Sequence, residues 1–164
     1  MIEQPAHEII IASNEEEIQQ CYKVRIDVFT HEQGFPIETE IDHLDPVSIH
    51  FLLRLKPSLI PIGVIRCSQY GPGTYKLSRL AVLKEYRRFK FGVELVQTLH
   101  NWIQADANQG QGQAGGSVKV VCHSQIPVKS FYAKFGYIPE GEEFDEDGDP
   151  HQKLILELPI PLQS

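Results

Sequence analysis

Four basic residues lie close together in one short stretch of this chain. The segment RLAVLKEYRRFKFGVEL, residues 79–95, contains Lys84, Arg87, Arg88 and Lys90 and leads from an apolar run into an amphipathic helical pattern. A strand that runs directly into a helix leaves unpaired backbone N–H groups and the positive end of the helix dipole at the junction, and both attract anions. The segment therefore predicts a site for an anionic ligand.

A solvated helix start is the alternative explanation for such a cluster of charges. Gly92 favours the ligand, because a glycine inside a helix costs about 1 kcal/mol relative to alanine and is useful where a ligand approaches the backbone closely. The pattern thus predicts that the anion is held against the backbone around Gly92.

The composition predicts a single domain, residues 1–164, that needs neither a metal nor a disulfide to fold. Its 15 Lys and Arg against 22 Asp and Glu give a net charge of −7, which argues against nonspecific binding to nucleic acid or to a membrane surface. The three cysteines are far apart, and the chain shows neither a signal-peptide pattern nor an apolar run of transmembrane length. We expect a cytoplasmic protein, with the nucleus as the alternative.

Hydrophobic periodicity and turn signals predict strands and helices in mixed order. The expected elements are a strand at 7–12, a helix that begins after Ser13 or Asn14, a polar loop at 30–46, strands at 50–55, 61–69 and 75–83, a helix from 91 that ends in a flexible Gly- and Gln-rich stretch at 108–117, a strand at 118–122, a helix at 126–135 that Gly136 ends, an acidic turn, and a strand at 153–158. This order predicts an α/β or α+β domain with one mixed sheet.

Two segments of the chain resemble the signatures of a known family. The segment LAVLKEYRRFKFGVELV resembles the acetyl-CoA-binding motif of the GNAT superfamily of N-acetyltransferases, in which Arg87 and Gly92 match and Lys90 replaces the first glycine. The segment SQIPVKSFYAKFGYIP resembles the second family signature, and the segments VRIDVFTHEQGFPIETEID and DEDGDPHQKL resemble the ElaA-type subgroup. The resemblance implies the GNAT fold, a largely antiparallel mixed sheet that is splayed in the middle and flanked by helices.

The same resemblance implies how the co-substrate acetyl-CoA binds. The backbone of Leu80, Ala81 and Val82 matches the strand that pairs with the pantetheine amides, so the ligand acts as an added strand. The segment from Arg88 to Val93 matches the pyrophosphate loop, and Arg87 and Lys84 are candidates for the outer phosphates. The implied binding residues are Leu80, Ala81, Val82, Arg87, Arg88, Phe89, Lys90, Phe91, Gly92 and Val93.

Acetyl transfer to an amine requires a neutral amine, a stabiliser of the oxyanion and a proton for the leaving thiolate. Tyr132 matches the family tyrosine that donates this proton, and a backbone N–H near Val82 is a candidate for the oxyanion. Candidates for the base are Glu32, His123 and His151, with Asp42 and Asp45 as weaker ones. A Cys122–His123 dyad is excluded because adjacent strand residues point to opposite faces. We expect Glu32, His123 and His151 to converge in one acceptor pocket.

Arg25 interrupts an otherwise apolar helical stripe, so it requires either a ligand or a carboxylate partner, for which Glu32 and Glu40 are candidates. The segment DHLDPVSIH has residue types that bind metals but no recognised metal spacing, so we expect a structured loop and no metal.

Two other functions fit parts of this pattern. A noncatalytic module that binds acetyl-CoA or CoA would explain the loss of a motif glycine at Lys90, and a nucleotide binder would need no tyrosine at 132. The leading prediction is an enzyme that acetylates a small-molecule amine or a protein lysine, as a monomer or a homodimer, without binding nucleic acid or membrane.

Overall fold

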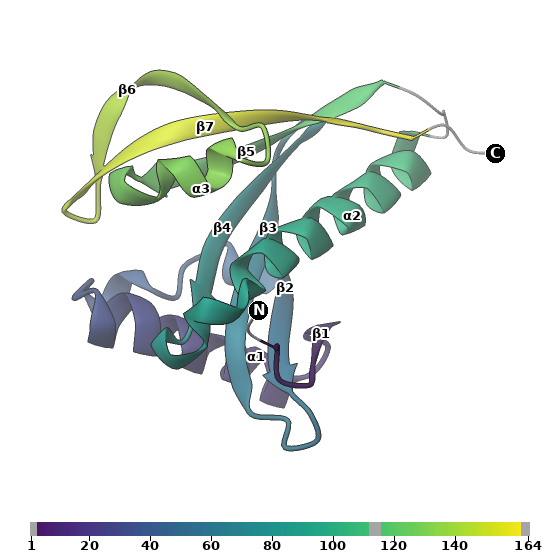
Figure 1. Cartoon of the computed structure of the whole chain (residues 1–164). Helices are drawn as coiled ribbons and strands as arrows, with labels where there is room; N and C mark the ends of the chain where they lie inside the picture. Colours follow the sequence, from purple (N-terminus) through teal and green to yellow (C-terminus); the bar gives the residue numbers. More distant parts are fainter. Residues whose placement is uncertain (1–2, 112–115, 162–164) are drawn as a thin grey trace. The chain divides into compact units, whose positions relative to one another are not determined.

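The computed structural model describes residues 3–111 and 116–161 (Figure 1). These residues form two compact units that alternate along the chain. Unit 1 contains the residues up to Ser68 together with Arg79–Leu99, and unit 2 contains Gln69–Ser78 together with the residues from His100 onward. Strands from both units belong to one seven-stranded sheet, whose order is β1-β2-β3-β4-β5-β7-β6. The predicted mixed α/β fold class is confirmed.

Unit 1 begins with a strand, a helix and two further strands. Its elements are β1 (His7–Ile11), α1 (Glu15–Arg25), a π-helix (Ile26–Glu32), 3₁₀ helices at Ile37–Thr39 and Asp45–Val47, β2 (Ile49–Leu55), most of β3 (Pro61–Gly71), the end of β4 (Thr74–Val82), a 3₁₀ helix at Lys84–Phe89 and the start of α2 (Phe91–Gln111). Strands β1, β2 and β3 pair antiparallel in sequence order. The strands predicted for this unit therefore form with ends shifted by at most two residues, whereas those predicted at 118–122 and 153–158 are longer by up to four residues at one end.

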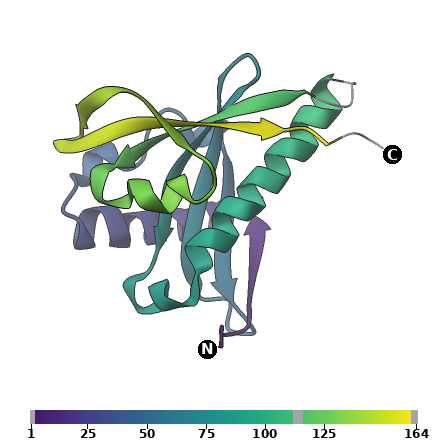
Figure 2. The same ribbon diagram turned by 45° about the horizontal axis from the view of Figure 1, so that its top comes forward.

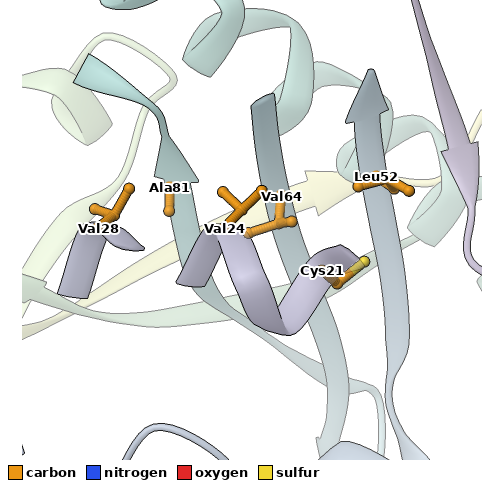
Figure 3. Packing of buried hydrophobic residues seen from close by; sticks show 6 residues of the cluster. All are labelled: Cys21, Val24, Val28, Leu52, Val64 and Ala81. Carbon is orange, nitrogen blue, oxygen red and sulfur yellow. The ribbon is translucent and has the colours of Figure 1, made fainter. Parts of the chain in front are cut away.

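A side-chain cap stabilises the start of helix α1, and an apolar stripe packs the helix against the sheet. The Asn14 side chain accepts a hydrogen bond from the Glu17 backbone N–H at 2.9 Å, which satisfies one of the free N–H groups of the first turn. Figure 3 shows the buried cluster of unit 1, in which side chains of the helical segment lie against three strands; its members are Cys21, Val24, Val28, Leu52, Val64 and Ala81. Burial of each larger side chain stabilises the unit by about 1.5–3 kcal/mol.

Unit 2 is built on three strands at the other end of the sheet order. Its elements are the start of β4, the remainder of α2, β5 (Ser117–Gln125), a 3₁₀ helix at Ile126–Val128, α3 (Lys129–Ala133), β6 (Ile138–Glu146) and β7 (Asp149–Pro159). Strand β4 pairs with β5 in parallel at Thr74–Lys76, whereas β5 and β6 pair antiparallel with β7. The sheet is therefore mixed. Helix α3 lies beside the hairpin of β6 and β7 (Figure 2).

Strand β6 was not predicted, because its residues were interpreted as an acidic turn. The strand contains five acidic residues, Pro139 and a left-handed Gly141, and its pairing register shifts between Glu140 and Phe144. These residue types have low strand propensity, but an edge strand tolerates proline, bulges and charges because one side faces no further strand. Its turn is nonetheless specified locally: Asp147 and Gly148 both have positive φ, as a two-residue hairpin turn requires.

Three further expectations need correction. Residues 126–135 contain a 3₁₀ turn and a helix of five residues in place of one continuous helix. Helix α2 starts at Phe91, so Gly92 lies in its first turn and not in its interior. The helix also continues to Gln111, into the stretch predicted to end it, and residues 112–115 of that stretch lie outside the described part.

Arg25 is the centre of a buried ion network in unit 1. Its side chain is only 1% exposed, and its guanidinium donates to the Glu40 carboxylate at 2.9 Å and to the Asp45 carboxylate at 2.7 Å. The prediction that Arg25 requires a carboxylate is confirmed for Glu40, whereas Glu32 pairs with a different arginine. Burial by itself would raise the pKa of Asp45, but hydrogen bonds from Arg25, the Asp42 backbone and Arg66 hold this pKa well below its usual range.

Two arginines of the strands complete the network. Arg66 on β3 donates to Asp42 at 2.8 Å and to Asp45 at 2.9 Å. Arg79 on β4 donates to the Glu40 backbone carbonyl and to the Asp42 carboxylate at 3.1 and 3.3 Å. The three arginines thus balance the charge of three carboxylates, Glu40, Asp42 and Asp45. Residues 39–45 are held by charge-assisted hydrogen bonds from α1 and two strands, and they include the start of the segment 42–50 that was predicted to be a structured loop.

No helix within the described residues is long and apolar enough to cross a bilayer.

We predict that Arg25→Met destabilises the protein by about 3–5 kcal/mol, because the substitution removes a buried guanidinium that donates to both the Glu40 and the Asp45 carboxylates and leaves Arg79 and Arg66 as their remaining partners. Urea denaturation followed by circular dichroism measures this change. Lys23→Met is the matched control: its side chain is 71% exposed and, among the residues that the structure describes, its one ion pair is with Asp27, so a change below about 0.5 kcal/mol is expected. Equal effects of the two variants would contradict the importance of the network.

Candidate active site

The predicted anion-binding segment forms a short 3₁₀ helix that leads into a long one. Residues 84–89 form the 3₁₀ helix, Lys90 is in the left-handed region with φ 63° and ψ 27°, and α2 follows from Phe91 over 21 residues. A left-handed residue reverses the chain direction between two helices, and glycine normally takes this place because side chains are strained there. Lys90 is also the residue that replaces a motif glycine, so the backbone keeps the glycine-like conformation without the glycine.

Three cations of this segment are exposed and make no ion pair with the described residues: Lys84, Arg88 and Lys90. Arg88 stacks over the Phe89 ring at 4.8 Å, which leaves its guanidinium edge accessible. The first backbone N–H groups of α2 lie at the same place, where the helix dipole favours negative charge. This donor set fits a pyrophosphate, because it combines free cations with backbone N–H groups at the start of a long helix.

Arg87 differs from its three basic neighbours because it already has an acidic partner. Its two terminal nitrogens donate to the two oxygens of Glu32 at 2.5 and 2.6 Å, and its Nε donates to the Val82 carbonyl at 2.9 Å. Hydrogen bonding from Arg87 lowers the pKa of Glu32. A lower pKa makes Glu32 a weaker base, and a paired Arg87 must exchange this partner to contact a phosphate.

The strand segment expected to contact pantetheine lies at the end of β4. Ala81 and Val82 are 3% and 8% exposed, and Ala81 belongs to the buried cluster beneath α1. Arg79 has φ 54°, so the extended backbone is interrupted directly before Leu80. The side chains therefore serve the core, and main-chain pairing with a ligand at Leu80, Ala81 and Val82 stays a prediction.

Tyr132 projects from α3 onto one face of β5. The residue is 8% exposed, and burial raises the pKa of its hydroxyl, with a smaller contribution from Cys122. Cys122 lies opposite Leu154 in the register, and Leu156 is on the same face of the sheet. Leu156 is also close to Gly136, just after α3, where a side chain would come within 3.2 Å of it. Because its pKa is raised, the Tyr132 phenol stays protonated at neutral pH, as a proton donor must.

His123 and His151 lie on the other face of the same strands, because side chains alternate along a strand. His123 Nδ1 is 2.9 Å from Glu146 Oε1, and His151 Nε2 is 3.7 Å from Glu146 Oε2. The Phe144 ring contacts both imidazoles, with ring centroids 5.1 and 6.2 Å away. The structure thus brings two of the three predicted bases together around one carboxylate in unit 2. Glu32 belongs to unit 1, and its proximity to them stays a prediction.

Glu146 is the residue of this cluster that sequence reasoning missed. The dipeptide Asp147–Gly148 was the available signal, since Asp-Gly between two strands predicts a two-residue hairpin turn. That turn places Glu146 opposite Asp149 and Phe144 opposite His151. An acidic turn at these residues would give the Glu146 carboxylate no defined position, whereas pairing of β6 with β7 gives it one.

The remaining candidate catalytic residues are buried or held in ion pairs. Burial raises the pKa of the Cys122 thiol to about 12, so this thiol is a poor nucleophile at neutral pH. Asp42 and Asp45, the weaker candidates for the base, are both engaged by arginines of the buried network. Within the described residues, no group of three or more metal-binding side chains could hold a metal ion.

Comparison with known proteins assigns the chain to a family. A family model described as Acetyltransferase (GNAT) domain matches residues 25–158, which include parts of both units. The chain belongs to the GNAT acetyltransferase family. The uncharacterized N-acetyltransferase YjcF of Bacillus subtilis is 32% identical over 147 residues, which cover 89% of this chain and 96% of YjcF. The predicted enzyme class is confirmed, and acyl-CoA is the donor that GNAT enzymes use.

Solved structures show the same fold. The crystal structure of a proposed N-acetyltransferase from Lactobacillus plantarum has a TM-score of 0.79 at 25% identity, with 93% of this chain and 99% of that chain covered. Escherichia coli ElaA has a TM-score of 0.74 at 21% identity, with 91% and 97% covered. The GNAT fold, with ElaA among its structural relatives, is therefore confirmed.

We predict that Lys90→Gly is neutral or stabilises this GNAT protein by up to about 1 kcal/mol. Relief of left-handed strain is worth about 1–2 kcal/mol, and the larger entropy of glycine in the unfolded chain offsets about 0.4–1 kcal/mol of it. Lys84→Gly, at a position without positive φ, is the control and should destabilise by about 0.5–1 kcal/mol. Thermal denaturation compares the two. A larger loss for Lys90→Gly than for Lys84→Gly would mean that the Lys90 side chain itself supports the fold.

Proposed function

We propose that this protein is an acetyl-CoA-dependent N-acetyltransferase that transfers the acetyl group to a primary amine by direct attack on the thioester. The observation that carries the proposal is the set of three exposed cations without an acidic partner among the described residues, at the start of α2 and within the family's cofactor motif. Free cations at such a position favour a ligand with several phosphate charges.

The donor would supply an activated acetyl group, and the protein would supply the binding groups. The backbone from Arg88 to Val93 would hold the pyrophosphate, with Lys84, Arg88 and Lys90 as the cations. The main chain of Leu80–Val82 would pair with the pantetheine amides. Arg87 would join the phosphate contacts only after release of Glu32, so Lys84 is the better candidate for an outer phosphate.

The acceptor side requires a proton acceptor. An alkylamine with a pKa near 10.4 is protonated at pH 7, and its neutral form costs about 4.6 kcal/mol, so an unassisted amine would react slowly. His123 and His151 fit this role better than Glu32, whose carboxylate is held by Arg87. A backbone N–H near Val82 remains the candidate that would stabilise the oxyanion.

The proposal is tested in two steps. A thermal-shift screen with acetyl-CoA, CoA, ATP and NAD should show stabilisation by the first two ligands, because ligand binding to the native state raises the melting temperature. A thiol-release assay with small amines and a lysine-containing peptide should then show turnover and identify the acceptor class. Stabilisation by CoA without turnover of any amine would favour a noncatalytic CoA-binding module, and absence of stabilisation would contradict the proposal.

We predict that Gly92→Val weakens acetyl-CoA binding at least tenfold, about 1.4 kcal/mol, because a branched side chain in the first turn of α2 crowds the approach to the backbone. Isothermal titration calorimetry measures the affinity. Gln97→Val introduces the same side chain at an exposed position of the same helix and should leave the affinity unchanged. Unchanged affinity in both variants would rule out this placement of the pyrophosphate.

We predict that Tyr132→Phe lowers kcat by about tenfold or more and leaves the acetyl-CoA affinity nearly unchanged, because the lost hydroxyl acts mainly on the leaving thiolate. Steady-state kinetics with an accepted amine, together with calorimetry, separates the two effects. Tyr137→Phe removes the hydroxyl that lies 2.8 Å from His100 Nε2 and should keep kcat within about twofold. Equal turnover of Tyr132→Phe and the wild type would assign Tyr132 to packing.

A further inference from the structure

We propose that Glu146 is a positioning residue that holds His123 in the tautomer whose Nε2 accepts the proton of the incoming amine. This inference rests on the proposed acetyltransferase function and names the base of that reaction. It depends on a side-chain cluster on one face of β5, β6 and β7, all within unit 2.

The pleat of the strands places the cluster on one face. In the register, His151 lies opposite both Gln125 and Phe144, and side chains at directly opposite positions point to the same side. His123 is two residues from Gln125, and Glu146 is two residues from Phe144, so both point to that side as well. The hairpin turn at Asp147–Gly148 thus brings the Glu146 carboxylate to 2.9 Å from His123 Nδ1.

The hydrogen bond determines which ring nitrogen carries the proton. Hydrogen bonding from His123 lowers the pKa of Glu146, so this side chain is a carboxylate at neutral pH and can only accept. His123 Nδ1 must therefore be the donor, and the neutral ring has its lone pair on Nε2. Phe144, whose ring meets His123 edge to face at 5.1 Å, restricts rotation of the imidazole.

His151 is held differently, although it is adjacent to the same carboxylate. Its Nδ1 donates to the Asp149 carbonyl at 2.8 Å, so the Nε2 of its neutral ring carries a lone pair that faces Glu146 Oε2 at 3.7 Å. Two acceptors that face each other form no hydrogen bond. His151 is also the more buried of the two, with a side chain 7% exposed against 18% for His123, so the proposal assigns the base to His123.

The other charges around the pair come from neighbouring strands. Lys76 of β4 acts on the Glu146 carboxylate electrostatically, and Lys153 of β7 lies opposite His123 in the register. The Lys153 ammonium pairs with Glu140 at 3.3 Å. Glu146 is thus the carboxylate that contacts His123 directly, whereas the Lys153 ammonium pairs with a different carboxylate, Glu140.

The proposed step is balanced in protons and electrons. The ammonium group of the acceptor gives one proton to His123 Nε2, and the resulting neutral nitrogen forms a bond to the acetyl carbon while the carbon–sulfur bond breaks and its electron pair stays on sulfur. The thiolate takes a proton from Tyr132, which regains one as the nitrogen loses its second proton. His123 then releases its proton to solvent. Nothing is oxidised or reduced.

Tyr132 lies close enough to Cys122 of β5 for the two to interact electrostatically, whereas the next residue, His123, points to the other face of that strand. The donor serves the leaving sulfur and the base serves the attacking nitrogen, so the two side chains need not share one face. The placement of these two side chains therefore agrees with the two roles.

The first experiment needs no activity. Long-range ¹H–¹⁵N NMR of the imidazole rings at pH 8, on the whole protein, should show the Nδ1–H tautomer for His123 in the wild type. Glu146→Gln should convert a large share of His123 to the Nε2–H tautomer, whereas Glu143→Gln, at an exposed position of the same strand, should leave the tautomer unchanged. An Nε2–H tautomer in the wild-type protein would overturn the proposal.

The second experiment uses turnover with an amine that the wild type accepts. Glu146→Gln should lower kcat about tenfold or more with an acetyl-CoA KM within about twofold, Glu146→Asp should recover part of kcat, and Glu143→Gln should match the wild type. A parallel fall of kcat and of thermal stability in both Glu146 variants would assign Glu146 to folding and overturn the positioning role. If the wild type acetylates no amine, the proposed function fails, and the NMR result still decides the tautomer.

Discussion

The buried ion network of unit 1 is the constraint on which the loop around Glu40–Asp45 depends. Arg25, Arg66 and Arg79 come from a helix and two strands, and they converge on three carboxylates of one short segment. Removal of a buried charge from water costs several kcal/mol, so each group is tolerated only while its partners are in place. The segment around Glu40–Asp45 therefore keeps one conformation only while the helix and both strands are assembled beneath it.

The network also determines what the acids of this segment contact. Asp45 accepts hydrogen bonds from two guanidinium groups and from the Asp42 backbone, and Asp42 accepts from Arg66 and Arg79. Their lone pairs are therefore occupied by fixed donors. The same residues keep Asp42 and Asp45 ionised and hydrogen-bonded, which suits a structural role better than proton transfer.

Charged groups elsewhere in the protein fall into two classes. Arg87 and Glu32 satisfy each other through a bidentate pair, and Glu146 satisfies His123, whereas Lys84, Arg88 and Lys90 have no acidic partner among the described residues. Paired groups are oriented, and unpaired cations are available to a ligand. An acidic protein can thus keep a local group of free cations, because the local potential at the start of α2 depends on the charges there and not on the net charge.

Several features could be predicted from local sequence because local physics determines them. The cap at Asn14 follows from its short acceptor side chain, and the strands β2 and β3 follow from apolar runs between turn signals. Strand β6 could not be predicted from propensity, because its acidic residues form a strand only when β7 supplies the hydrogen-bonding partner. The conformation of Lys90 was equally hidden, since the residue type disfavours the left-handed region that the chain reversal imposes.

The sequence by itself determined the family, the position of the basic segment proposed to bind an anion, Tyr132 as a candidate donor and the need of Arg25 for a partner. These properties belong to residue types at fixed spacing along the chain. Only the tertiary structure decided which partners were chosen: Glu40 and Asp45 for Arg25, Arg87 for Glu32, and Glu146 for His123. The physical reason is that ion pairs and imidazole tautomers depend on distances of about 3 Å between residues far apart in sequence, and strand register and chain reversals alone bring those residues together.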